Sequence, residues 1–318
     1  MEFRLLREGS IVSHKKIIVH LSGGLGNQMF QYMAGASLAK KSGHELVINL
    51  NWFSNPIFRN KGNPVYLTKR KADILQFQAV ARTKVDWVAT PCDGRMERLV
   101  SIFNSSIGEF LGITSETNFR RPESENVNST KRLFGFFMSP KFFSDIDPKP
   151  IFAELSPPLT KWSLEMKEML KSNKSIGVHI RLGDYVSLGD KVIPTEEYFL
   201  KGVEQLLSIL GLSSKIYLFT DEPKKLSELF PVLASRGVII SPPKYTTSAE
   251  NLIVLSSCHA FVCSNSTFSW WGAALSNASD SLVVRPSYFY TEKPLEDSHA
   301  DLWGPTAISL HPLSGENA

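Results

Sequence analysis

Residues 17–50 read IIVHLSGGLGNQMFQYMAGASLAKKSGHELVINL, and this stretch decides the fold of the N-terminal half. A β-branched run at 17–21 leads into a glycine turn and then into a helix-like stretch at 27–41. Apolar residues in that stretch are spaced for one buried stripe. Gly43 ends it, and residues 45–50 form a second β-branched run. A strand, glycine turn, helix and strand in this order predict the start of a parallel α/β sheet.

The same alternation recurs in the C-terminal half, where short apolar runs alternate with helix-like stretches. We expect strands at 175–180, 215–219, 237–240 and 260–263, and helices at 195–210, 223–230, 249–257 and 267–276. Thr195, followed by two glutamates, supplies a cap and first-turn acids for the first of these helices. Repeated units of this kind predict a doubly wound, Rossmann-like domain.

The sequence changes character between the halves. Residues 101–130 are polar, and residues 145–160 are rich in proline. We therefore place a linker around 150–172. The predicted fold class is α/β, with an N-terminal Rossmann-like domain over residues 1–160 and a C-terminal one over residues 161–318.

Composition limits the classes of partner. The 318 residues are 42% hydrophobic and 21% charged, as in ordinary globular proteins, and the net charge is +4. That excess is too small to indicate a nucleic-acid partner, but it suits an anionic nucleotide or an acidic membrane surface. Three cysteines without a CxxC pair favour reduced thiols. No apolar stretch has the length of a signal peptide core or a membrane span, so we expect a cytoplasmic protein.

The segment HIRLGDY at 179–185 follows a predicted strand. Strand residues alternate between faces, so His179 and Arg181 point the same way. At the carboxyl end of a parallel strand, Arg181 would lie where ligands bind and could grip a diphosphate with its planar donors. The alternative is a structural ion pair between Arg181 and Asp184, bracing the turn at Gly183. The residues alone leave both interpretations open.

Residues 262–275, VCSNSTFSWWGAAL, carry a second candidate site. Hydroxyls of Ser264, Ser266 and Thr267, with free N–H groups at the start of a helix, form an anion site. Trp270 and Trp271 suggest a helix packed hard on the sheet. The alternative is an ordinary helix cap with core tryptophans, although the polar groups exceed what capping needs.

The glycine turn begins like a dinucleotide fingerprint with Gly24 and Gly26, but Met29 occupies the third glycine position. No acid follows the second strand either. A tight structural turn is therefore the simpler interpretation of the glycines. Asn27 and Gln28 at the helix start favour a functional role for the turn, because their side-chain amides would face the cleft between the domains, where ligands bind in such sheets.

Two further carboxylate pairs are ambiguous. Asp221 and Glu222 follow the predicted strand at 215–219, where they could cap the next helix or line the cleft. The formal DxD at 145–147 lies in a proline-rich stretch with no strand before it, so we expect a loop. No His, Cys, Asp and Glu cluster has convincing metal-ligand spacing. Leaving-group charge would then be met by arginine, hydroxyls and a helix dipole.

Three segments together resemble a known family. LSGGLGNQMFQY at 21–32, HIRLGDY at 179–185 and SNSTFSWWGAAL at 264–275 look like glycosyltransferase family 11, the α-1,2-fucosyltransferases, and the resemblance covers about residues 17–290. It implies a GT-B fold, with GDP-β-L-fucose held mainly by the C-terminal domain. It also implies inverting, metal-independent transfer of fucose, without a cofactor, to the 2-hydroxyl of a β-linked galactose.

The resemblance also implies roles for individual residues. It makes His179 nucleotide-binding and Arg181 the group that stabilises departing GDP; Ser266 and Thr267 would hold phosphate oxygens, and Asn27 would face the reacting centre. To the donor side we also assign Asn265, Gly24, Gly26, Asp221 and Glu222, and to the acceptor side Gln28 and Tyr185. Asp184 is our first candidate for the general base, with orientation of Arg181 as its alternative role; Asp221 and Glu222 come second.

Two positions depart from the family pattern. Relatives often carry a second arginine where this chain has Leu182, which by strand alternation should pack inward. A guanine-reading aspartate has no counterpart, because Ser-Pro-Pro occupies 241–243.

The resemblance implies a bacterial enzyme acting on a galactose-containing oligosaccharide or lipid-linked glycan, as in O-antigen synthesis, with peripheral contact at the inner membrane face. The acceptor loops, expected within residues 50–145, leave other linkages open, such as α-1,6 or protein O-fucosyl transfer. A glycan- or nucleotide-binding protein without turnover is the alternative from another class. A dinucleotide oxidoreductase comes third, because the fingerprint is incomplete.

Overall fold

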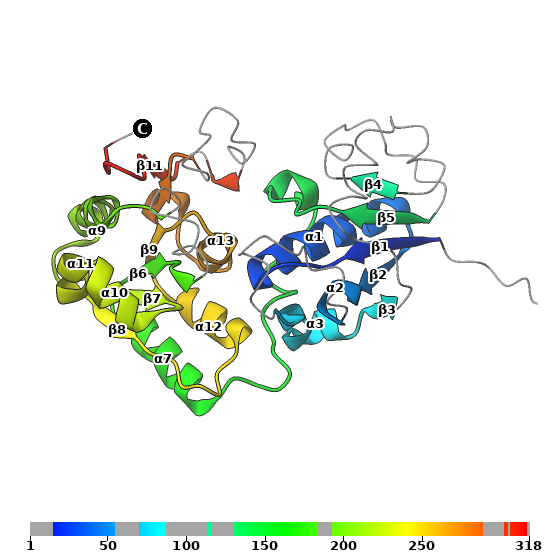
Figure 1. The fold of residues 1–318 in the computed structure, drawn as a ribbon, viewed down its shortest axis with the longest axis horizontal. Coiled ribbons are helices and arrows are strands. Elements are labelled where there is room, and N and C mark those ends of the chain that lie inside the picture. The colour runs from blue at the N-terminus through cyan, green and yellow to red at the C-terminus, as the bar shows by residue number, and fades with distance from the viewer. Residues whose placement is uncertain are drawn as a thin grey trace, which may run out of the picture.

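The computed structural model describes residues 15–54, 70–86, 113–115, 130–183, 193–288, 302–304 and 306–316. Within these ranges the chain forms two parallel sheets, one in each half of the sequence (Figure 1). Helices pack against both sheets. The fold is therefore α/β with two Rossmann-like halves, and the GT-B-type architecture predicted from the sequence is confirmed.

The N-terminal sheet has the strand order β3-β2-β1-β5-β4, and its neighbouring strands pair in parallel. Its strands are β1 (Lys16–His20), β2 (Glu45–Asn49), β3 (Lys84–Asp86), β4 (Ile113–Ser115) and β5 (Lys131–Phe134). Helix α1 (Leu25–Ser42) follows β1 through the glycine turn and ends at Gly43, whose φ of 65° is left-handed. The unit predicted over residues 17–50 is thus confirmed, with the helix starting two positions earlier.

The C-terminal sheet has the strand order β11-β10-β9-β6-β7-β8, again with parallel neighbours. Its strands are β6 (Ser175–Ile180), β7 (Lys215–Thr220), β8 (Val238–Ile240), β9 (Ala260–Cys263), β10 (Val283–Pro286) and β11 (Ile308–Leu310). Counted along the chain, this is the 3-2-1-4-5-6 order of a Rossmann sheet. The direction of crossing reverses between β6 and β9, and that reversal is the switch point at which such sheets bind ligands.

The helices follow the predicted pattern, with additions. The other α-helices described are α2 (Asn51–Ser54), α3 (Gln78–Ala81), α7 (Lys161–Ser172), α9 (Glu196–Leu210), α10 (Pro223–Leu229), α11 (Pro231–Arg236), α12 (Ser248–Leu255) and α13 (Thr267–Ala274). Single 3₁₀ turns are η3 (Asp73–Gln76), η4 (Pro140–Phe143) and η5 (Asp280–Leu282). Thr195 caps α9, because its hydroxyl accepts from the N–H of Tyr198 at 3.4 Å. That cap is as the sequence predicts.

The connection between the halves differs from the predicted linker at 150–172. Its second part is helix α7, which packs against α12. Glu250 of α12 fastens the start of α7, because its Oε1 accepts from the N–H of Thr160 at 2.8 Å and from Ser163 Oγ at 3.1 Å. Residues 161–172 therefore belong to the C-terminal half, and no strand of either sheet lies between residues 135 and 174.

The C-terminal sheet is covered on both faces. Ile176, Val178 and Ile180 of β6 pack into a cluster with α9, whereas Phe261 and Cys263 of β9 pack into a second cluster on the opposite face. Alternation along buried strands thus fills two separate cores, as expected for a doubly wound sheet.

A third core lies across the two halves of the molecule. It joins β1 and α1 to side chains of α12 and α13. Here the tryptophan pair differs from its prediction: Trp270 and Trp271 pack mainly against the N-terminal half and not on the C-terminal sheet. The Phe30 ring lies 4.7 Å from Trp270 and 4.9 Å from Trp271, and Phe143 stacks on Trp271 at 5.9 Å. Helix α13 therefore lies between the two halves and contacts both α1 and β9 (Figure 1).

Candidate donor site at the switch point

The predicted donor residues gather at the carboxyl ends of β6, β7 and β9. His179 pairs with Cys263 in the sheet register, so Arg181 and the Ser264–Thr267 segment leave neighbouring strands side by side. The register between β6 and β7 ends at Ile180 and Thr220, which brings Asp221 beside Arg181. These positions coincide with the switch point, where Rossmann-type sheets bind ligands.

Asp221 holds the arginine in place. Arg181 Nη1 lies 2.5 Å from Asp221 Oδ2, and the two side chains are 21% and 29% exposed. The other oxygen, Asp221 Oδ1, accepts from the N–H groups of Leu182 at 3.0 Å and Gly183 at 3.1 Å. A side chain at Gly183 would collide with the Asp221 carboxylate and displace it from its present position. One carboxylate thus fixes both the guanidinium and the backbone that follows it.

The charge state of Asp221 follows from these contacts. Burial alone would raise its pKa, but the Arg181 charge and the two backbone donors outweigh burial and lower the pKa. The carboxylate is therefore ionised at neutral pH, and it already accepts from three donor atoms, Arg181 Nη1 and the backbone nitrogens of Leu182 and Gly183.

His179 is a buried, neutral imidazole. Its Nδ1 lies 2.6 Å from Ser269 Oγ and 3.5 Å from Ser264 Oγ, and its ring lies 5.1 Å from that of Phe268. Burial lowers the pKa of His179 to about 4; Arg181 lowers it further, and Asp221 opposes both. The histidine is thus held by the segment after β9, in a fixed orientation beside Arg181.

The start of α13 carries the predicted hydroxyls. Ser266 caps the helix, because its Oγ accepts from the N–H of Phe268 at 3.3 Å. Thr267 Oγ1 instead donates to Asn27 Oδ1 of the N-terminal half at 2.8 Å. Ser266 and the neighbouring Asn265 are both buried. Capping therefore uses the hydroxyl of Ser266, and the hydroxyl of Thr267 bridges the two halves.

The glycine turn meets α13 directly. A Cβ on Gly26 would lie 2.6 Å from Thr267 Oγ1 and 2.8 Å from the backbone nitrogen of Phe268, so the close approach requires glycine. Trp271 Nε1 donates to the Gly26 carbonyl at 2.9 Å. The motifs GGLGNQ and SNSTFSWW are thus two sides of one contact. Gly24, the residue before α1, is extended, and an added Cβ would meet Arg70 at an ordinary 3.6 Å.

Gln28 has a structural role in place of acceptor binding. It is fully buried, and its Nε2 donates to the carbonyls of Gly23 at 3.0 Å and Lys71 at 2.9 Å. Its Oε1 accepts from the N–H of Ile74 at 3.1 Å. Both amide donors are committed, so we reassign Gln28 to fastening the turn against residues 71–74.

The remaining predicted residues are placed as follows. Glu222 lies at the surface, where its Oε1 is 3.6 Å from Lys225 Nζ, and neither it nor Asp221 caps α10. Leu182 is fully buried in the core, as strand alternation predicts. Asp184 and Tyr185 lie outside the described residues.

Sequence reasoning missed a polar cluster in the N-terminal half, formed by His20, Asp86 and Arg132. Asp86 ends β3, His20 ends β1, and Arg132 lies in β5. Arg132 Nη1 is 3.2 Å from Asp86 Oδ2 and 3.5 Å from His20 Nε2, while the His20 ring stacks on Phe134 at 4.0 Å. The sequence did carry one signal for this cluster, because His20 is a polar residue at the end of an apolar strand.

The cluster is partly accessible and holds a neutral histidine. The side chains of Arg132 and Asp86 keep 21% and 15% of their exposure. Burial lowers the pKa of His20 to about 3, with Arg132 adding to the effect and Asp86 opposing it. The cluster therefore offers hydrogen-bond donors and acceptors at the carboxyl edge of the N-terminal sheet, the same edge from which the glycine turn leaves β1.

The DxD segment is part of the packing around α1. Asp145 accepts from Ser37 Oγ and lies 3.4 Å from Lys40 Nζ and 3.5 Å from Lys41 Nζ. Among the described residues, no group of three or more His, Cys, Asp and Glu side chains has the arrangement of a metal site. In the same ranges, no helix combines the length and apolar character that crossing a membrane requires.

Solved structures that match this chain include fucosyltransferase NodZ from Bradyrhizobium, at 14% identity and TM-score 0.45 over 83% of this chain and 94% of that chain. Another is the ADP-heptose lps heptosyltransferase II of E. coli, at 11% identity and TM-score 0.44 over 95% and 92%.

Sequence comparison is more specific. The model of Glycosyl transferase family 11 matches residues 159–301, which include the whole predicted donor site except the glycine turn. An alpha-1,2-colitosyltransferase of Escherichia coli is 22% identical over 88% of this chain and 94% of its own length. The O-antigen biosynthesis glycosyltransferase WbnK of Escherichia coli is 25% identical over 89% and 98%. The family match and the two near full-length relatives together show that the chain is similar to glycosyltransferases of family 11.

Proposed function

We propose that this glycosyltransferase moves L-fucose from GDP-β-L-fucose to the 2-hydroxyl of a β-galactoside, with inversion and without a metal ion. The observation that carries the proposal is Arg181, fixed by Asp221 at the switch point beside the first turn of α13. A guanidinium and a helix N-terminus are both suited to the diphosphate of a nucleotide sugar.

The proposed reaction is a single displacement. The acceptor hydroxyl oxygen attacks C1 of fucose from the face opposite GDP, and the C1–O bond to GDP breaks. A base takes the proton from the acceptor hydroxyl. Because the transition state resembles an oxocarbenium ion, stabilisation of the departing diphosphate should dominate the rate. Arg181 supplies that charge, supported by the hydroxyls of Ser266 and Thr267.

Asp221 is a poor choice as the general base. A carboxylate that accepts from Arg181 and two backbone N–H groups has a lowered pKa and little remaining capacity to take a proton. We assign it instead to positioning Arg181. Asp184 stays the candidate base proposed from the sequence.

The acceptor side of the proposal rests on the His20, Asp86 and Arg132 cluster. Sugar hydroxyls are recognised by paired donors and acceptors, and a stacked ring gives a sugar an apolar surface to lie on. This cluster provides the paired donors and acceptors, beside the stacked rings of His20 and Phe134, at the carboxyl edge of the N-terminal sheet. We propose that it binds the galactoside, and that the galactoside belongs to an O-antigen precursor on the cytoplasmic side of the membrane.

A second donor is favoured by one comparison. The relative named as an alpha-1,2-colitosyltransferase shares the length of this chain. Colitose is the 3-deoxy form of L-fucose, so a site of the same general shape could accept either sugar. Competing donors therefore belong in the test.

The test is to incubate the protein with GDP-fucose or GDP-colitose and a panel of β-galactosides. Released GDP is quantified, and the linkage of the product is determined by NMR. We expect α-1,2-linked product from GDP-fucose, unaffected by EDTA, and none from Arg181→Ala. If product forms only from GDP-colitose, the assigned donor changes from GDP-fucose to GDP-colitose. If the product has another linkage, the assigned acceptor hydroxyl changes. Failure to turn over any GDP-sugar with any galactoside would refute the proposal.

A further inference from the structure

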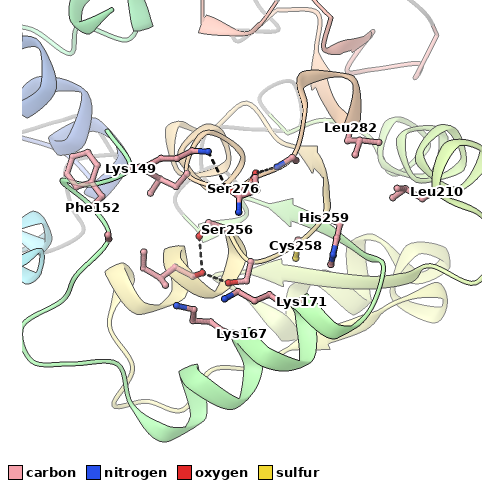
Figure 2. A pocket seen from close by; sticks show the side chains of 16 residues that line it. Lys149, Phe152, Lys167, Lys171, Leu210, Ser256, Cys258, His259, Ser276 and Leu282 are labelled. Atoms are coloured by element: carbon pink, nitrogen blue, oxygen red, sulfur yellow. Dashed lines mark hydrogen bonds between the residues drawn. The ribbon is translucent and has the colours of Figure 1, made fainter. Parts of the chain in front are cut away.

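A hollow of about 700 Å³ is lined by residues that include Lys171, Cys258 and His259 (Figure 2). Its wall includes Cys258 and His259, which come directly before β9, and Lys171 near the end of α7. His259 also donates its backbone N–H to Ser175 O at the first residue of β6, at 2.9 Å. The hollow is therefore at the amino ends of the strands and is separate from the donor site at their carboxyl ends.

The charged side chains that line the hollow are all basic. They are Lys149, Lys167 and Lys171, and no aspartate or glutamate is among the described residues that line it. Lys167 and Lys171 lie one turn apart on α7, whereas Lys149 enters from the opposite wall, where its Nζ is 3.5 Å from Asn277 Oδ1 (Figure 2). Three ammonium groups thus converge on one hollow from two sides.

The lysines have little anionic compensation. The carboxylate of Glu168 lies 3.8 Å from Lys171 Nζ, but it is 78% exposed, and such surface pairs contribute little. Burial lowers the pKa of Lys167, and the charge of Lys171 lowers it further, with Glu168 opposing both. Like charges one turn apart are unfavourable unless an anion lies between them.

The rest of the wall is apolar or already hydrogen-bonded. Phe152, Ile253 and Leu282 give it an apolar surface. The hydroxyls of Ser256 and Ser276 donate to main-chain carbonyls at 2.9 Å and 2.6 Å. Attraction for an anion therefore comes from the lysines, and the apolar wall can receive a less polar group attached to it.

A competing explanation is that the lysines neutralise helix ends. Helices α7, α12 and α13 all finish near this edge, and cations stabilise C-terminal carbonyls. That effect reaches only the last turn. It accounts for Lys171, which lies in the last turn of α7, but not for Lys167, which lies one turn earlier.

We propose that this hollow is a second ligand site, which binds the phosphate or diphosphate head of an amphipathic phosphate ester. Two sources share that chemistry, a soluble organic phosphate and the head of a membrane lipid. The site is independent of the donor site, so it stands whether or not GDP-fucose is the donor.

The test uses the full chain, and the pocket variant separates binding in the hollow from binding at the donor site. Binding of inorganic pyrophosphate is measured by calorimetry, and binding to phosphatidylcholine vesicles with and without phosphatidic acid is measured by sedimentation. The pocket variant is Lys167→Ala with Lys171→Ala. The matched control is Lys161→Ala, on the same helix but 90% exposed and paired with Glu165.

We expect saturable binding of pyrophosphate or of phosphatidic-acid vesicles. The pocket variant should weaken it about tenfold or more, because lost charged hydrogen bonds are worth about 1.5–3 kcal/mol, and the control should not. Binding to pyrophosphate marks a soluble ligand, and binding to the vesicles alone marks a lipid head. No binding in either arm, or equal binding by the pocket variant, would overturn the proposal; a variant that loses only thermal stability would support the helix-end explanation instead.

Discussion

Replacing Asp221 by asparagine isolates what positions Arg181. Asparagine keeps the size of the side chain and an oxygen that can accept from Leu182 and Gly183. It removes the negative charge 2.5 Å from Arg181 Nη1 and can place an NH₂ group against the guanidinium. The arginine therefore stays in the protein but loses its fixed orientation.

The size of the effect follows from the lost contact. A hydrogen bond to a charged group is worth about 1.5–3 kcal/mol, which corresponds to about 10- to 150-fold in rate if the loss is felt only in the transition state. We expect kcat to fall by that factor in Asp221→Asn, with the KM for the galactoside near its wild-type value. Removing the guanidinium itself, in Arg181→Ala, should cost more.

The assay is the initial rate of GDP release at saturating donor, with unfolding followed in parallel. Glu204→Gln is the matched control, because Glu204 pairs with Arg236 at 3.2 Å in the same half of the molecule but at an exposed position. Wild-type kcat in a folded Asp221→Asn protein would refute the positioning role. So would a large loss in Glu204→Gln, since the effect would then be general.

The same variant has a signature in the pH dependence of stability. The pKa of Asp221 lies below its ordinary value of 3.8, so the ionised carboxylate stabilises the folded state. That contribution is complete above about pH 4 and is lost as the pH falls through the folded-state pKa. Asp221→Asn should therefore be less stable than wild type at neutral pH, and the difference should shrink in acid, as measured by urea unfolding at several pH values. A difference independent of pH would contradict the assigned charge state.

Three further variants test other contacts. Gly26→Ala should lower the Tm and the rate, because its Cβ would lie 2.7 Å from the backbone carbonyl carbon of Thr267, and such overpacking costs about 1–3 kcal/mol; a Tm at or above wild type would contradict this. Trp271→Phe keeps a ring but loses the bond to the Gly26 carbonyl, so it should cost about 1–3 kcal/mol of unfolding free energy, and no change in urea unfolding would contradict that. Arg132→Met should raise the KM for the galactoside without changing the affinity for GDP, whereas an equal loss of both would indicate general damage near Asp86.

The strands that carry the site could be predicted from the sequence, because apolar runs that end in polar residues mark the ends of strands. The ion-pair partner of Arg181 could not be predicted from the sequence. Asp184 was proposed because it is close in the chain, whereas the ion pair described here is with Asp221, which follows the neighbouring strand β7. Both residues were already candidates, and parallel pairing of β6 with β7 was the missing information. Local sequence gives distance along the chain, and only the sheet order gives distance across it.

Burial by distant segments was equally invisible. Gln28 and Asn27 are neighbouring amides at the start of α1, and nothing local distinguishes them. In the structure, residues 71–74 cover Gln28, whereas Asn27 meets Thr267 from the other half of the molecule. The tryptophans of α13 were likewise predicted to be buried, but their apolar pattern does not say which half of the molecule buries them.

The contact between the glycine turn and α13 gives a physical reason for the specificity of both motifs. Thr267 has one hydroxyl proton, and in this structure it points to Asn27 Oδ1. A phosphate oxygen accepts hydrogen bonds but donates none, so the Thr267 hydroxyl can hold the donor diphosphate only by giving up Asn27. The released Asn27 oxygen then needs a new donor, and the acceptor sugar approaching from the N-terminal half carries hydroxyls that can supply one. In our proposal, donor binding would thus exchange a bond between the two halves of the protein for one bond to each substrate. Gly26 and Trp271 hold the halves together during that exchange, because their contact does not involve the Thr267 hydroxyl proton.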